Sequence, residues 1–224
     1  MIFENMERFT FLFWGLSHYQ GALHEMMGIV TRRINNKGTD SIILLEHPPV
    51  ITLGRLTKSE DLLGTITDSR ISGIPYVKTD RGGGPTLHSP GQLVIYPVIR
   101  LKKSEQNLRR LLFAYEESLI RTSGDFGVHA GRIEGKTGVW AGKDKLASIG
   151  IHLKKWVTYH GLALNVSNDL SLFQAIIPCG LTGVKMTSLE KIAAEKIDMN
   201  KVKQSFITHF LQVWDEVFPE KVMA

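Results

Sequence analysis

Residues 81–96 read Arg-Gly-Gly-Gly-Pro-Thr-Leu-His-Ser-Pro-Gly-Gln-Leu-Val-Ile-Tyr, a glycine-rich loop that leads into an apolar run. Three consecutive glycines adopt backbone angles closed to other residues and let another group approach bare backbone. The apolar run Leu93–Val98 predicts a buried strand that carries the loop. Glycine and proline also mark ordinary turns. Because Arg81, His88 and Gln92 lie in this segment, we interpret it as the wall of a substrate site in preference to an ordinary turn.

Helical patterns occur before and after this segment. Apolar residues recur at helical spacing over 23–34 and again over 108–119, with the second helix expected to start after Ser104. The residues Thr187-Ser188-Leu189-Glu190 form a capping-box pattern for a helix through Ile197. A last helix is expected to open at Asn200.

Strand patterns lie between the predicted helices. Short apolar runs predict strands at 41–45, 50–53 and 76–79. Residues 145–153 and 156–166 predict two antiparallel strands joined at Lys154 and Lys155, in which Gly150 and Gly161 mark a bulge or a close backbone approach. This order of elements predicts an α+β fold in which helices pack against a sheet.

Composition bounds the class of protein. The chain has 224 residues, of which 43% are hydrophobic, and we expect one domain over residues 1–224. The sequence contains no run of about eighteen apolar residues, so no membrane span is expected. The aromatic stretch Phe11–Trp14 is too short for a secretory signal, so the expected location is the cytoplasm. A single cysteine, Cys179, excludes an intramolecular disulfide and argues against a cysteine-based zinc site.

The chain is basic, with 27 Lys and Arg against 22 Asp and Glu, a formal charge of +5 and a pI near 9.3. Such a charge favours an acidic partner through long-range attraction. The basic residues are spread as pairs, without an aromatic RNA-recognition signature, a zinc knuckle or a basic arm. An acidic protein is therefore as good a partner as nucleic acid.

Cys179 lies between Pro178 and Gly180. A lone cysteine is most often a small buried apolar residue. Here the proline restricts the chain and the glycine removes side-chain bulk, so the pattern predicts a sulfur on a rigid turn with a free backbone N–H beside it. That arrangement would suit an attacking thiolate.

A thiolate needs a partner that stabilises its charge or takes its proton. The candidates are His88, His160 and Lys145. Histidine is the usual partner. Lys145, however, opens an apolar strand and is expected to be half-buried. Burial in general favours proton exchange by lysine near neutral pH. His47 and His152 fit structural hydrogen bonding better.

Several ordered motifs resemble one known family. They are the Arg81-Gly-Gly block ending in Thr-Leu-His-Ser-Pro-Gly-Gln, the segment Gly138-Val-Trp leading to Lys145-Leu-Ala-Ser-Ile-Gly, the Tyr159-His-Gly-Leu-Ala-Leu-Asn-Val block, and Pro178-Cys-Gly. Together they are similar to octanoyltransferase, also called lipoate-protein ligase B. The likeness covers nearly the whole chain and includes Leu45-Glu-His-Pro-Pro-Val and Met186-Thr-Ser-Leu. Leu87 departs from the family, which mostly carries an aromatic residue there, so the resemblance does not give the detailed shape of the acyl pocket, whereas the implied chemistry is unaffected.

The resemblance implies a fold and a reaction. The fold would be that of biotin and lipoate ligase catalytic domains, a mixed, largely antiparallel sheet packed with helices. The reaction would move an octanoyl or lipoyl group from acyl carrier protein to a lysine of a lipoyl domain, in lipoate synthesis, without ATP, metal or another cofactor. The acceptors would be the lipoyl domains of 2-oxoacid dehydrogenase complexes and the glycine cleavage H protein, with neither nucleic acid nor membrane as partner.

The resemblance also implies site residues. Cys179 would be the acyl-thioester nucleophile and Lys145 the partner that stabilises its thiolate. The substrate contacts would be Arg81, Gly82, Gly83, Gly84, Pro85, Thr86, Leu87, His88, Ser148, Ile149, Gly150, Gly161, Leu162 and Ala163.

Two other classes stay open on the sequence. An ATP-dependent lipoate or biotin ligase of the same fold would use the glycine loop for an adenylate and would need a lysine but no cysteine. A non-catalytic binder of a carrier protein or of nucleic acid would tolerate the loss of Cys179, and nucleic-acid binding would depend strongly on salt.

Overall fold

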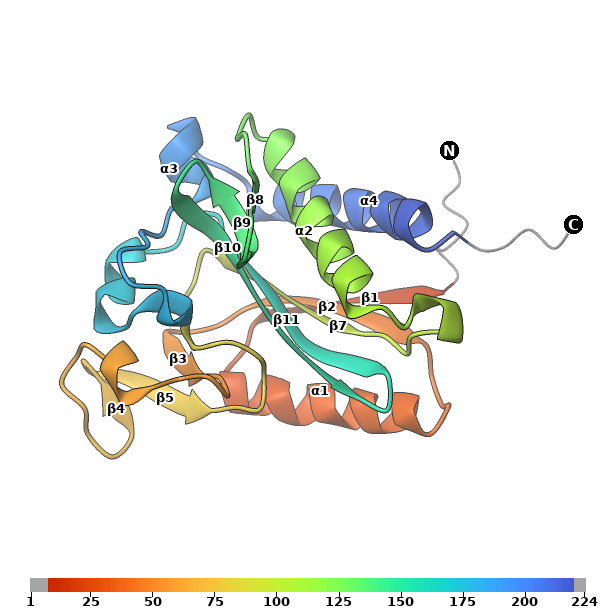
Figure 1. The fold of residues 1–224 in the computed structure, drawn as a ribbon, viewed down its shortest axis with the longest axis horizontal. Coiled ribbons are helices and arrows are strands. Elements are labelled where there is room, and N and C mark those ends of the chain that lie inside the picture. The colour runs from red at the N-terminus through yellow and green to blue at the C-terminus, as the bar shows by residue number, and fades with distance from the viewer. Residues whose placement is uncertain (1–7, 220–224) are drawn as a thin grey trace, which may run out of the picture.

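A computed structural model describes residues 8–219. Figure 1 shows a central sheet with helix α1 on one face and helices α2 and α4 on the other. A smaller sheet lies beside the large one, at the end where α1 begins. The two sheets and the loops between them form the site described below.

Within the described residues, the larger sheet has seven strands in the order β1-β2-β7-β11-β10-β9-β8. Their bounds are β1 Phe9–Leu16, β2 Asp40–Glu46, β7 Gln92–Val98, β8 Gly131–Ile133, β9 Lys136–Ala141, β10 Asp144–Lys154 and β11 Val157–Asn165. Strands β1 and β2 are parallel, and the other neighbours are antiparallel. The prediction of a mixed, largely antiparallel sheet is confirmed.

The smaller sheet has four strands within residues 8–219, in the order β4-β5-β3-β6. Their bounds are β3 Val50–Leu53, β4 Arg70–Ile71, β5 Ile74–Lys78 and β6 Pro85–His88. Strand β6 is the last part of the glycine-rich loop, and it pairs with β3 from Leu53–Pro85 to Val50–His88. This pairing fixes the position of the glycines that precede β6.

The core has a layer on each face of the large sheet. Because side chains alternate along a strand, Leu93 and Ile95 of β7 face α2 and α4, whereas Val94 and Tyr96 face α1. Both faces are covered, which explains why all of β7 is buried and reads as a continuous apolar run. The helices are α1 Tyr19–Ile34, α2 Leu108–Gly124, α3 Leu189–Ala193 and α4 Met199–Val217.

Short 3₁₀ turns connect these elements. They are η1 Ser59–Asp61, η2 Lys103–Glu105, η3 Leu170–Ala175 and η4 Pro178–Gly180. No helix in the part of the chain that the structure describes is long and apolar enough to cross a membrane.

Three elements differ from the predictions. The aromatic stretch Phe11–Trp14 belongs to edge strand β1, whose apolar residues the sequence analysis considered only as a leader. Helix α2 starts at Leu108 because residues 103–105 form a separate 3₁₀ turn and Asn107 caps the helix. The predicted helix through Ile197 stops at Ala193, because Ala194 takes a left-handed conformation.

Candidate active site

Cys179 lies in turn η4 with φ 59° and ψ 15°, a left-handed conformation that is uncommon for a residue with a side chain. Such a conformation costs about 1 to 3 kcal/mol and persists only where the surroundings impose it. Gly84 provides part of that constraint, because a Cβ atom there would lie 2.9 Å from the Cys179 carbonyl carbon. The glycine loop therefore packs directly against the peptide that carries the thiol.

The backbone N–H after the thiol is not free. The Gly180 N–H donates to the Ile177 carbonyl at 3.0 Å, which closes the 3₁₀ turn. The prediction of a free N–H beside the sulfur named no residue, and the N–H of Gly180 does not meet it. The turn needs the bond for its own closure.

Lys145 is the side chain that meets the thiol. It is 1% exposed, and its Nζ donates to Cys179 Sγ at 3.1 Å and to the Thr137 carbonyl at 3.0 Å. The ammonium also lies 5.1 Å from the centre of the Trp140 ring, a cation–π distance. Lys145 is more deeply buried than the half-burial expected from its place at the start of a strand.

Backbone hydrogen bonds connect Lys145 to the segment after the cysteine turn. The Lys145 N–H donates to the Lys185 carbonyl at 2.8 Å, and the Thr187 N–H donates to the Lys145 carbonyl at 2.9 Å. Strand β10 and the cysteine segment are thus held together on both sides of the Lys145–Cys179 pair.

Gly138 makes room for the lysine. Its φ is 125°, and a Cβ atom there would lie 2.8 Å from Lys145 Cε and 2.6 Å from the Ala147 carbonyl oxygen. The motif that contains Gly138 indicated no role for this glycine. Its spatial neighbour Lys145 is across a strand pair, so only the register of β9 on β10 reveals the contact.

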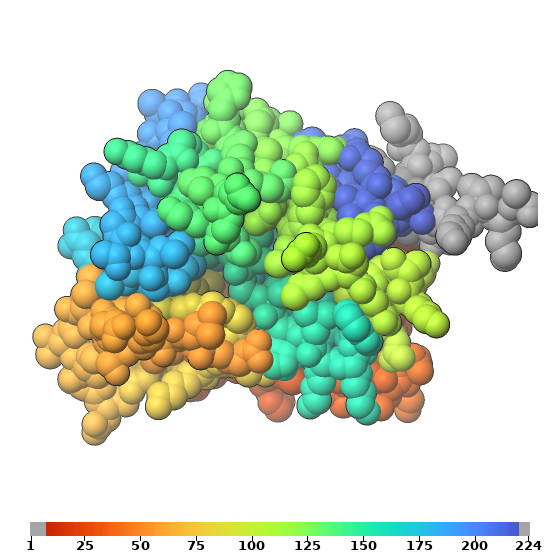
Figure 2. Space-filling view, viewed as in Figure 1, coloured from red at the N-terminus to blue at the C-terminus, as the bar shows by residue number. Residues whose placement is uncertain are grey.

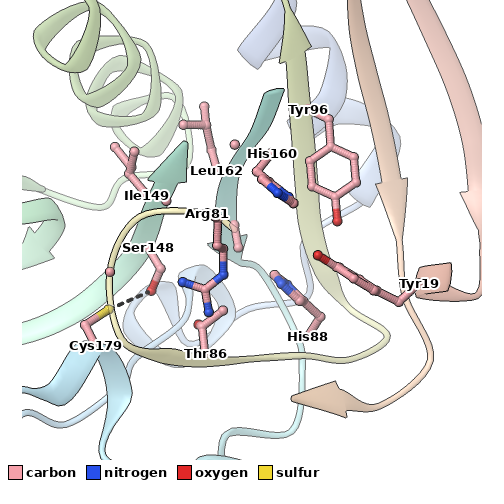
Figure 3. A pocket seen from close by; sticks show the side chains of 14 residues that line it. Tyr19, Arg81, Thr86, His88, Tyr96, Ser148, Ile149, His160, Leu162 and Cys179 are labelled. Atoms are coloured by element: carbon pink, nitrogen blue, oxygen red, sulfur yellow. Dashed lines mark hydrogen bonds between the residues drawn. The ribbon is translucent and has the colours of Figure 1, made fainter. Parts of the chain in front are cut away.

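A pocket opens beside the thiol. Figure 3 shows Cys179 and Ser148 on one side, Arg81 between, and Tyr19, Tyr96, His88 and His160 on the other side. The Ser148 hydroxyl lies 3.9 Å from Cys179 Sγ. In Figure 2 the segments around residues 55 and 180 meet on one face, where the Ile177 N–H donates to the Asp61 carbonyl at 2.7 Å.

Most of the predicted substrate contacts lie around this pocket. Those that line it are Arg81, Gly83, Thr86, His88, Ser148, Ile149, Gly150, Gly161, Leu162 and Ala163, together with Cys179. Those that do not are Gly82, Gly84, Pro85 and Leu87. Strand alternation explains Leu87, because Thr86 and His88 face the pocket and Leu87 faces the core of the small sheet. The departure at Leu87 thus lies behind the pocket wall.

Two of the pocket glycines serve the packing of the walls. A Cβ atom at Gly161 would overlap the Ile95 carbonyl oxygen of β7, and one at Gly150 would lie 2.9 Å from the Gly82 carbonyl oxygen. The prediction of close backbone approach at both positions is confirmed. The approaching backbone belongs to the protein itself.

Arg81 places a buried positive charge on the pocket wall. Its guanidinium donates to the Thr52 carbonyl at 2.6 Å, to the Thr52 hydroxyl and to the Gly82 carbonyl at 3.0 Å. These acceptors are neutral. Burial lowers the pKa of Arg81, and the nearby Cys179 opposes that shift. The pocket therefore contains a cation that can attract an anionic or carbonyl oxygen.

The histidines near the pocket have partners other than the thiol. His88 Nδ1 lies 2.7 Å from Gln92 Oε1, and His160 Nε2 lies 2.7 Å from Asp80 Oδ1. Tyr19 and Tyr96 also line the pocket, and neither was predicted from the sequence. Tyr96 could have been found from its inward place on β7, whereas nothing near Tyr19 in the sequence marks it.

No group of His, Cys, Asp and Glu side chains within residues 8–219 has a geometry suited to hold a metal ion.

This chain is similar in sequence to known proteins over most of its length. Residues 19–211 match the family described as lipoyl protein ligase A/B catalytic domain. An octanoyltransferase of Maridesulfovibrio salexigens is 48% identical over 79% of this chain and 83% of that protein. Another of Solibacter usitatus is 42% identical over 94% of this chain and 95% of that protein. The chain belongs to the octanoyltransferase family. It is an acyltransferase of the biotin and lipoate ligase superfamily.

Solved structures of this superfamily share the fold. A bipartite lipoate protein ligase from Thermoplasma acidophilum, described with its E2 lipoyl domain, has a TM-score of 0.66 at 14% identity, over 92% of this chain and 82% of that chain. A lipoate-protein ligase A bound with ATP has a TM-score of 0.66 at 15% identity, over 94% of this chain and 84% of that chain. The biotin protein ligase of Aquifex aeolicus has a TM-score of 0.53 at 13% identity, over 93% of this chain and 69% of that chain. The predicted likeness of fold is confirmed.

Proposed function

We propose that this octanoyltransferase, acting as one catalytic domain over residues 1–224, moves an octanoyl or lipoyl group from acyl carrier protein to the ε-amine of a lysine on a lipoyl domain. Cys179 carries the acyl group as a thioester between the two substrates. The observation that carries this proposal is the 3.1 Å contact between Lys145 Nζ and Cys179 Sγ at the wall of the pocket. The family supports octanoyl transfer within lipoate synthesis.

In the first step the Cys179 thiolate attacks the carbonyl carbon of the donor thioester. The new bond joins that carbon to Sγ, and the bond to the carrier's pantetheine sulfur breaks. Lys145 supports this step from 3.1 Å, because its ammonium stabilises the thiolate and can then protonate the departing thiol. The exchange of one thioester for another is nearly thermoneutral, so orientation and charge stabilisation are the main requirements.

In the second step the lysine amine of the acceptor attacks the acyl-enzyme. A carbon–nitrogen bond forms, the bond to Sγ breaks, and the amine proton passes to the neutral Lys145 amine. The cation and the thiolate are then restored together. Since the N–H of Gly180 is engaged in its turn, the Arg81 guanidinium and the Ser148 hydroxyl are the proposed donors to the oxyanion on the pocket wall.

The charge of the chain fits the proposed donor and acceptors. Acyl carrier protein and lipoyl domains, including the H protein, are expected to be acidic partners for a chain of formal charge +5. Attraction of this kind raises the association rate more than the affinity. The proposed setting is the cytoplasm, with neither ATP nor a metal in the reaction.

Intact-mass measurement tests the proposal. Native enzyme incubated with octanoyl-carrier protein, without ATP and with a chelator, should gain one octanoyl mass. Cys179→Ala should gain none. Cys179→Ser, which keeps size and removes the thiolate, should form any ester far more slowly. An adduct that persists in Cys179→Ala removes the nucleophile assignment, and transfer that requires ATP and free octanoate favours the ligase alternative.

A further inference from the structure

His160 has an unusual position in the wall of the pocket. It lies within β11 with φ 55°, opposite Ile151 of β10, and it is 1% exposed. Its Nε2 lies 2.7 Å from Asp80 Oδ1, and Tyr159 donates its hydroxyl to Asp80 Oδ2 at 2.5 Å. A carboxylate that accepts at both oxygens requires the ring proton on Nε2.

The other ring nitrogen of His160 is then a bare acceptor. Nδ1 is buried and has no hydrogen-bond partner among the described residues, while its ring lines the pocket. Burial also lowers the pKa of His160 from its ordinary 6.5, so the ring stays neutral. A buried acceptor of this kind costs free energy until a donor reaches it.

His88 presents a second acceptor to the same space. The Gln92 amide nitrogen donates to the Leu87 carbonyl at 3.1 Å and to Asn165 Oδ1 at 2.9 Å, so Gln92 Oε1 accepts from His88 Nδ1. His88 Nε2 therefore carries a lone pair. The Thr86 hydroxyl, also buried and without a partner in the described part of the chain, lines the same pocket.

The strand register places His160 three residues along β11 from the residue that pairs with Ser148, beside the thiol. Ser148, whose hydroxyl lies 3.9 Å from Sγ, pairs with Ala163. His160 is three residues from Ala163 along β11, a separation of roughly 10 Å at the rise of a strand. An extended eight-carbon chain with carbon–carbon bonds of about 1.5 Å spans roughly 9 Å from its carbonyl to its last carbon. A chain bound to Cys179 and directed toward this end of the pocket brings its last carbons to His160.

We propose that the pocket accepts medium-chain acyl groups with a hydrogen-bond donor, a hydroxyl or a thiol, near the far end, and that His160 Nδ1 accepts that bond. Asp80 acts as a positioning residue, because it holds the ring and fixes its tautomer. The inference rests on the proposed function, since the acyl group is taken to be bound at Cys179. A site built to bond a substrate hydroxyl discriminates against analogues that lack it more strongly than an apolar pocket discriminates by size.

The test compares octanoyl and 8-hydroxyoctanoyl thioesters of the carrier protein by the ratio of their kcat/KM values. Native enzyme should use the hydroxylated chain at least as well as octanoate. His160→Phe, which keeps an aromatic ring without the acceptor, should lower the ratio of hydroxylated to plain chain at least tenfold. Asp80→Asn should lower the same ratio at least threefold, because an amide no longer fixes the tautomer.

His129→Phe is the matched control. His129 is exposed and lies outside the pocket lining, so this variant should leave the ratio unchanged. If native enzyme discriminates more than tenfold against the hydroxylated chain, or if folded His160→Phe keeps the native ratio, the inference is wrong. If His160→Phe does not fold, the ratio of Asp80→Asn decides in the same way. Octanoyl adducts on Cys179 test the underlying reaction separately.

Discussion

At the residue level, one contact between the buried Lys145 ammonium and the Cys179 thiol carries the proposed chemistry. The sequence left Lys145, His88 and His160 as rival partners, because residue type alone does not give distance. The structure places Lys145 Nζ 3.1 Å from Sγ and gives both histidines other partners. Lys145 is identifiable from sequence only through the family motif, since a lysine before an apolar strand is ordinarily a solvated strand end.

Removal of the lysine charge should slow the reaction of the Cys179 thiol with an alkylating reagent. Alkylation of Cys179 near pH 7 should fall in Lys145→Met, and its pH profile should move to higher pH, because the thiolate is the reactive form. Lys145→Arg restores a charge that cannot exchange protons, so it should keep a reactive thiol but lose transfer to the amine. His88→Gln serves as the comparison. If His88→Gln moves the alkylation profile and Lys145→Met does not, a cysteine–histidine pair must replace the present assignment.

Gly138 provides a subtler test of the same contact. Gly138→Ala adds a Cβ atom that would lie 2.8 Å from Lys145 Cε and 3.2 Å from Nζ, so the ammonium must move. We expect kcat to fall at least tenfold, in line with the sensitivity of catalysis to small displacements. Gly142→Ala is the matched control, since Gly142 also has positive φ but has no atom within 4 Å of an added Cβ. Equal activity in the two variants would mean that the lysine position is not critical.

At the scale of the element, the hairpin of β10 and β11 was predicted from sequence, including the glycines at its centre. The register pairs Gly150 with Gly161. What the sequence could not give was the reason for those glycines, because it depends on which strand lies alongside. The Ile95 carbonyl of β7 occupies the space that a side chain at Gly161 would need. Strand β1 was missed since its partner, Asp40–Glu46, is remote in sequence and its outer edge is open.

Gly161→Ala should therefore destabilise the fold itself. The added methyl group would overlap the Ile95 carbonyl, and overpacking against backbone costs about 3 kcal/mol or more. For a chain of this length the midpoint of thermal unfolding should drop by roughly 5 °C or more. Gly21→Ala, on helix α1 with open space around the added Cβ, should leave the midpoint unchanged or raise it. A Gly161→Ala midpoint equal to native would contradict the packing described for this wall.

At the scale of the whole molecule, two buried imidazoles make stability depend on pH. Burial lowers the pKa of His47 to about 4 and that of His88 to about 3, from an ordinary 6.5. Between these values and 6.5 the unfolded chain binds more protons than the folded chain, so stability falls as pH drops below 6.5. Each imidazole contributes a loss of about 2 kcal/mol in the free energy of unfolding by pH 5.

Denaturant unfolding at pH 7.5 and pH 5 measures this loss. His47→Gln should lose about 2 kcal/mol less between these pH values than the native chain, because one buried imidazole no longer has to remain neutral. An identical loss in the two proteins would mean that His47 is protonated or exposed in the folded chain.

A single-turnover chase measures whether Cys179 carries the acyl group between the two substrates. Enzyme loaded from octanoyl-carrier protein is freed of donor, mixed with a lipoyl domain, and followed by mass against time. We expect the octanoyl mass mapped to Cys179 to disappear as octanoylated lipoyl domain appears, at a rate no slower than steady-state turnover. An octanoyl-enzyme that decays much more slowly than turnover, or acceptor octanoylation with no loss of mass from Cys179, would contradict the account.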